Sequence, residues 1–175
     1  MWFIENVILI ICLTGLIVSY KWFKFSTLSY TLILIFIILQ TIGAHYTYAL
    51  VPIDWFTNFF GFERNHYDRI VHFSFGFLLA IPFREFLIKT SEIKNKLWTY
   101  YVPVEMVFGT SAVYEIGEWF FAVSSDAEAG HAFLGSQGDV WDAQTDMFLA
   151  GLGAVCSMLT IFIIALFYKF KKNKK

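Results

Sequence analysis

The chain has 175 residues, of which 58% are hydrophobic and 15% are charged, and its net charge is −1. A water-soluble domain carries about 25% charged residues, so this composition excludes an ordinary soluble enzyme and indicates an integral membrane protein. No basic patch lies outside the loops and the tail, so we expect no nucleic-acid partner.

Five apolar segments are long enough to cross a bilayer, which takes about 20 residues of helix. They cover residues 2–20, 27–48, 68–88, 97–123 and 140–167. The first segment begins with the acidic stretch MWFIEN and lacks a small-residue cleavage site, so it is predicted to be a span and not a signal peptide. Residues 1–175 are therefore predicted to form a single integral membrane domain, an all-α bundle of five transmembrane helices.

The positions of the lysines predict the orientation of the bundle. Basic residues gather in the first loop at Lys21 and Lys24, around the loop that follows the third span, and in the tail from Lys169 onward. Five spans place these clusters on one side, which the positive-inside rule makes cytoplasmic. We therefore expect the N-terminus and the loops at 49–67 and 124–139 to face outward and the C-terminus to face inward.

Unusual polar residues gather at the outward ends of four predicted spans. They are His45 and Tyr48 on the second span, Arg64, Asp68, Arg69 and His72 around the start of the third, Glu115 and Glu118 on the fourth, and Asp142 and Asp146 on the fifth. An acid in the first helical turn can act as a cap, and this alternative explains Asp68 and Asp142. Capping does not explain His72 and Asp146, because each lies one turn deeper on the same face.

Glu115 and Glu118 give the strongest functional signal. They lie near the C-terminal end of their helix, where a negative charge opposes the helix dipole. At a rise of 1.5 Å per residue, Glu115 lies roughly 12 Å inside that end. An uncompensated carboxylate there costs about 2.5 kcal/mol or more. We therefore expect a cation, a bound metal or protonation to compensate the pair.

The outward polar residues suit a divalent ion such as zinc, manganese, iron or magnesium, because hard oxygen ligands with an imidazole are typical of such sites. The predicted ligands are Asp68, His72, Glu115, Glu118, Asp142 and Asp146. The predicted catalytic residues are Glu115, Glu118 and His72, and the predicted substrate-binding residues are Arg64, Arg69, His45 and Tyr48. No His-Glu-x-x-His motif and no Gly-x-Ser-x-Gly elbow occurs, so the pattern indicates a metal without naming a known metalloenzyme class.

Two further features are assigned structural roles. Arg84 and Glu105 lie at the same depth on neighbouring spans, near a bend expected at Pro103, and are predicted to form an ion pair. The small residues of the fifth span are predicted to pack against a neighbouring helix and not to form a phosphate-binding loop. They are Ala150, Gly151, Gly153 and Ala154.

Four stretches together resemble the YjdF family of small bacterial inner-membrane proteins, in the expected order over most of the chain. They are GAHYTYALVPIDWF (43–56), RNHYDRIVHFSFG (64–76), YEIGEW (114–119) and LGSQGDVWDAQTDMFLAGLGA (134–154). The resemblance implies a multi-pass protein of the bacterial cytoplasmic (inner) membrane and no particular activity.

A weaker similarity runs to VanZ-like membrane proteins, which pair an Asp-Lys-x-x-His-Phe-like helix start with a later Asp-containing helix. Here residues 68–73 read Asp-Arg-Ile-Val-His-Phe, so that Arg69 replaces the lysine, and Asp146 lies in the later helix. VanZ-like proteins are associated with glycopeptide resistance, so this similarity implies a role at the cell envelope.

Two classes of function, and a structural alternative, follow from these observations. The first is a metal-dependent hydrolase or transferase that acts on a lipid or an envelope precursor, with membrane lipids as its surroundings. The second is a non-catalytic binder or small transporter of a cation or lipid head group. A structural envelope protein with a self-satisfied polar network is the third. The sequence leaves the substrate, the metal and the oligomeric state open.

Overall fold

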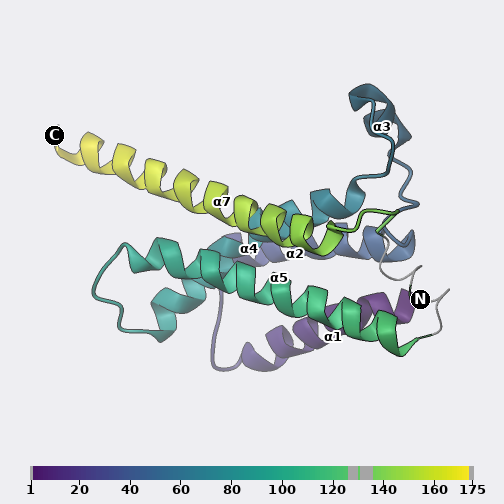
Figure 1. Ribbon diagram of the computed structural model, residues 1–175. Helices are drawn as coiled ribbons and strands as arrows, with labels where there is room; N and C mark the ends of the chain where they lie inside the picture. Colours follow the sequence, from purple (N-terminus) through teal and green to yellow (C-terminus); the bar gives the residue numbers. More distant parts are fainter. Residues whose placement is uncertain (1, 126–129, 131–135, 174–175) are drawn as a thin grey trace.

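A computed structural model describes residues 2–125, 130 and 136–173, and within these residues the chain is helical without strands. The helices are α1 (Trp2–Ser19), α2 (Thr27–His45), α3 (Asp54–Phe60), α4 (Tyr67–Thr90), α5 (Trp98–Ser124) and α7 (Asp142–Asn173). The long helices lie roughly side by side, and α3 stands apart near one end (Figure 1). The predicted all-α class is confirmed.

Each of the five predicted segments contains a helix with similar bounds. Three of these helices, α2, α4 and α7, are long and apolar enough to cross a membrane. Helix α5 carries Glu105, Glu115 and Glu118, and the apolar part of α1 is short, Asn6–Ser19. Five spans and their orientation therefore remain a prediction.

The second helix ends three residues earlier than predicted, and the loop after it contains the unpredicted helix α3. Thr47 and Tyr48 have positive φ angles of 51° and 53°, which an α-helix cannot continue through. Helix α3 ends at Gly61, whose φ of 66° supplies a left-handed C-cap. Trp55 and Phe59 of this helix are 72% and 79% exposed, as is typical of aromatic residues at a membrane–water interface.

Two sets of hydrogen bonds mark the opposite ends of the bundle. At one end, the Lys89 ammonium donates to the carbonyl oxygen of Lys24 (2.8 Å), and Glu85 accepts hydrogen bonds from the backbone N–H and the hydroxyl of Ser26 (both 2.7 Å). At the other end, the Arg64 guanidinium donates to the carbonyl oxygen of Ser136 (2.9 Å). The first basic loop therefore lies at the end of the bundle opposite the start of α4.

The closest helix packing joins α4 to α7. A methyl group added to Gly76 would lie 1.8 Å from the carbonyl oxygen of Ala150, and one added to Gly153 would lie 2.2 Å from that of Phe73. Only glycine permits these backbones to touch. The predicted packing role of the small residues is confirmed, because Ala150, Gly151, Gly153 and Ala154 are all buried.

The predicted ion pair between Arg84 and Glu105 is wrong. Among the described residues, Arg84 instead places its guanidinium over the Tyr100 ring, 4.5 Å from the centroid, and approaches the Thr99 hydroxyl at 3.4 Å. Glu105 is exposed and interacts with Tyr101, one turn earlier on the same helix. A stacked guanidinium on an aromatic ring replaces the expected charge pair.

Candidate functional site

The start of α4 is fixed by a local hydrogen-bond network. The Asn65 side chain accepts a hydrogen bond from the Tyr67 backbone N–H (2.9 Å) and donates one to the carbonyl oxygen of Val51 (2.8 Å). The Tyr67 hydroxyl donates to the carbonyl oxygen of Leu39 on α2 (2.9 Å). These bonds hold the first turn of α4 against α2, and Asp68 and His72 lie on that turn and the next.

Two arginines and two aspartates form what we call the arginine–aspartate assembly: Arg64, Arg69, Asp139 and Asp142. Arg64 contacts Asp142 at 2.9 Å and Asp139 at 3.4 Å. Arg69 also pairs with Asp139 and lies 3.9 Å from Asp142. A hydrogen bond from the Trp141 backbone N–H and the neighbouring guanidinium groups lower the pKa of Asp139. The assembly ties the segment before α7 to the start of α4.

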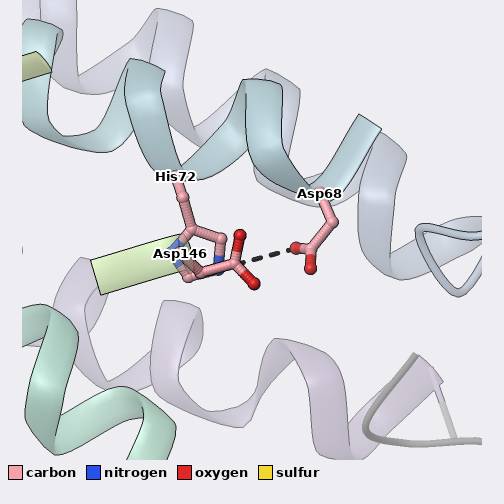
Figure 2. Close-up of side chains that lie close together, drawn as sticks. All are labelled: Asp68, His72 and Asp146. Atoms are coloured by element: carbon pink, nitrogen blue, oxygen red, sulfur yellow. Dashed lines mark ion pairs between the residues drawn. The ribbon is translucent and has the colours of Figure 1, made fainter. Parts of the chain in front are cut away.

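Next to this assembly lies what we call the carboxylate–histidine cluster: Asp68, His72, Glu115 and Asp146. The His72 Nε2 atom lies 3.5 Å from an Asp68 oxygen and 3.6 Å from a Glu115 oxygen. Asp68, His72 and Asp146 each place one ligand atom within 4.8 Å of the others. Figure 2 shows Asp68 and His72 of α4 pointing toward Asp146 of α7. Glu115 lies on α5 and contacts His72, so the cluster joins three helices.

The cluster contains more carboxyl groups than nearby cationic side chains pair with. In the assembly, Arg64 and Arg69 pair with Asp139 and Asp142. Within the described part of the chain, the carboxyl groups of Asp68, Glu115 and Asp146 then have only the His72 imidazole as a nearby basic group. Glu115 and Asp146 are only 8% and 2% exposed. One carboxylate oxygen of each is buried and has no hydrogen-bond partner among the described residues. Such groups are costly unless a cation or a proton compensates them.

The structure brings together some of the predicted site residues and separates others. Asp68, His72 and Asp146 converge, with Glu115 beside them, whereas the predicted ligand Asp142 pairs with arginine. Glu118 lies half-buried one turn beyond Glu115 and outside the three-residue group.

The predicted substrate-binding residues also differ in their surroundings. Arg64 and Arg69 both face aspartates of the assembly. His45 is exposed and meets the Tyr46 ring edge-on, whereas Tyr48 is buried against Gly43. Their roles in binding a substrate stay predictions.

Sequence reasoning missed two features of this region. The first is a reciprocal pair of hydrogen bonds between the Gln137 side-chain amide and the Asn65 backbone (3.1 and 2.9 Å), for which the sequence carries no signal. The second is a cavity of about 540 Å³ bounded by α1, α2, α4 and α5, whose wall includes His72. Segments distant in the sequence form this cavity, so no local pattern predicts it.

Comparisons with known proteins indicate a membrane protein. The family described as "Predicted membrane protein (DUF2238)" matches residues 1–166. The chain is 33% identical over 159 residues to "Inner membrane protein YjdF" of Escherichia coli (strain K12), which covers 90% of this chain and 76% of that protein. No solved structure matches the chain.

Proposed function

We propose that this chain, which belongs to the DUF2238 family of membrane proteins, binds one divalent metal ion at its carboxylate–histidine cluster inside the membrane domain. With this ion the protein acts as a metal-dependent hydrolase or transferase on a lipid or a cell-envelope precursor. The observation that carries the proposal is the convergence of Asp68, His72 and Asp146, with Glu115 at 3.6 Å from His72.

The spacing of these ligand atoms suits one ion after a small contraction. Two atoms that each bind zinc at about 2.0–2.2 Å can lie at most about 4.4 Å apart. The ligand atoms of Asp68, His72 and Asp146 lie within 4.8 Å of one another, so side-chain rotation of a few tenths of an ångström would close the site. A bound divalent ion would offset the charge of the three carboxylates and give the buried Asp146 oxygen a partner.

A divalent ion held by Asp68, His72 and Asp146 would supply a water molecule of lowered pKa at this site. Glu115, which is buried beside His72, would accept a proton from this water molecule as its oxygen attacks the carbon or phosphorus of an ester. The bond to the leaving alcohol breaks, and the alcohol oxygen takes the proton from Glu115. In a transferase, an acceptor hydroxyl takes the place of water.

The proposed topology has five spans, an outward N-terminus and a cytoplasmic C-terminus. Its support is that Lys24 and Lys89 lie at the same end of the bundle, opposite Arg64 and Ser136. A reporter fused after Lys175 is therefore expected to be active only in the cytoplasm. A reporter active only outside would contradict the orientation.

A non-catalytic cation-binding protein is the second candidate. It is favoured by the arginine–aspartate assembly, because Arg64 and Arg69 already face aspartates and so offer no unpaired charge to an anionic head group. In this candidate the metal ion holds α4 and α7 together or is itself the ligand.

Product formation from bacterial membrane lipids separates the two candidates. The purified protein is incubated with the lipids and zinc or manganese, or with a chelator, and products are identified by mass spectrometry. We expect products only with metal, and none from Glu115→Gln. The matched control Glu92→Gln makes the same change at an exposed residue and should remain active. Metal binding without any product would contradict catalysis and favour the second candidate.

A further inference from the structure

The cavity beside the carboxylate–histidine cluster has an almost entirely apolar wall. It has a volume of about 540 Å³, within the range of about 300–1,000 Å³ that is typical of ligand sites. Among the described residues no aspartate, glutamate, lysine or arginine lines it, and His72 belongs both to this wall and to the cluster. The apolar cavity therefore adjoins the candidate metal site at His72.

The cavity opens sideways between α1 and α5. Helix α1 packs against α2 alone among the described helices, so one of its faces is separated from α4 and α5 by the cavity. Ile8 of α1 and Val113 of α5 line the cavity and are nevertheless 48% and 69% exposed. In a membrane this opening faces the hydrocarbon chains of the surrounding lipids.

A buried hydroxyl indicates that the occupant carries a polar atom. Ser111 is 2% exposed and lies on the cavity wall, and its hydroxyl has no hydrogen-bond partner among the described residues. Ser111 precedes Glu115 by four residues on α5, which places the two side chains on the same face of the helix. A carbonyl oxygen that accepted a hydrogen bond from Ser111 would lie next to the cluster.

We propose that this cavity binds one acyl chain of a membrane lipid, with the ester carbonyl at Ser111 and the chain along α1 and α2. Charged or sugar groups would lose their hydrogen bonds to water against such a wall, whereas a hydrocarbon chain loses none. The bilayer supplies such chains at the opening. Whether the bound lipid is a substrate rests on the proposed function, because its ester would face the metal site. Chain binding itself needs no metal.

Photo-crosslinking tests the inference. The full-length protein is reconstituted, in the presence of a chelator, into vesicles of phosphatidylethanolamine and phosphatidylglycerol that contain a phospholipid with a diazirine in one acyl chain. After illumination, mass spectrometry maps the adducts. We expect adducts to concentrate on cavity residues such as Leu13 and Ile37, well above those on Ile164, an exposed residue of α7.

Two cavity-filling variants and one matched control decide the outcome. Gly15→Phe and Ser111→Leu should lower the cavity adducts several-fold, because both residues line the cavity. Gly109→Phe is the control, since a Cβ atom at Gly109, as at Gly15, would meet no neighbouring atom within 4 Å, but Gly109 does not line the cavity. Cavity adducts no more frequent than those on Ile164, or unchanged in both filling variants, would overturn the inference.

The outcomes for chain binding and for metal binding are distinguishable. Metal retention is measured on a separate sample of the same protein that is prepared without chelator. Adducts spread evenly over a protein that retains metal in that sample would overturn this inference and leave the proposed metal site standing. Concentrated adducts on a protein that retains no metal would overturn the proposed function and support the acyl-chain cavity.

Discussion

The packing of α4 on α7 gives a prediction whose size follows from the structure. In Gly76→Ala the added methyl group would lie 1.8 Å from the Ala150 carbonyl oxygen and 2.8 Å from the Ala154 nitrogen. Ordinary contact begins at 3.4 Å, so one helix must move by about 1.6 Å. Backbone atoms of α7 block the methyl group, so no side-chain rotation can relieve the clash.

We expect Gly76→Ala to lower the free energy of unfolding by about 1–3 kcal/mol, the usual cost of overpacking. The matched control is Gly109→Ala, because a methyl group there meets no atom within 4 Å. Alanine in place of glycine stabilises a helix by up to about 1 kcal/mol, so the two variants should differ by about 1–4 kcal/mol. Thermal unfolding in detergent, followed by circular dichroism, measures the difference.

The same displacement should weaken metal binding, because Asp68 and His72 lie on α4 and Asp146 lies on α7. Metal–ligand distances tolerate about 0.2 Å, far less than the required shift. Gly76→Ala should therefore retain less metal than Gly109→Ala. Equal stability and equal metal retention in the two variants would refute the close contact between the helices.

Three further predictions concern charged groups. Arg64→Ala should lower the free energy of unfolding by about 3 kcal/mol, because it removes a partner of the buried Asp142. The double variant Arg64→Ala/Asp142→Ala should recover part of this loss, and additive losses would contradict the ion pair. Glu85→Gln should cost about 1 kcal/mol, because the carboxylate caps the start of α2; an unchanged melting temperature would contradict this. Burial and the nearby Arg69 and Arg64 lower the pKa of His66, so its contribution to stability is full above the ordinary value of 6.5 and is lost as the pH falls below it. His66→Gln should reduce the loss of stability below pH 6.5 in melting curves, and parallel curves would contradict this shift.

The sequence predicted the parts of the site that depend on helical spacing. Asp68 and His72 are four residues apart, so any helix through them places both side chains on one face. Hydrophobic segments and antiparallel order then put Asp146 and Glu115 at the same end of the bundle. These inferences need only helix geometry and the count of spans.

The choice of partners could not be predicted, because it depends on helix rotation and contact distance. Asp142 and Asp146 are also four residues apart, yet Asp142 meets Arg64 whereas Asp146 meets the cluster. Depth alone placed Arg84 beside Glu105, but the rotation of the helices directs Arg84 to Tyr100. The cavity depends on how far α1 lies from α4 and α5, which no spacing within one segment encodes.

Metal content is the measurement that tests the central claim most directly. The wild-type protein and Asp146→Asn are purified without chelator, dialysed together against zinc and manganese, washed, and analysed by inductively coupled plasma mass spectrometry. We expect about one divalent ion per wild-type chain and a much lower content in the variant, because Asp146 is one of the three ligands that converge. A wild-type protein that retains no ion, or a variant that retains as much as the wild type, would contradict a metal site between α4 and α7.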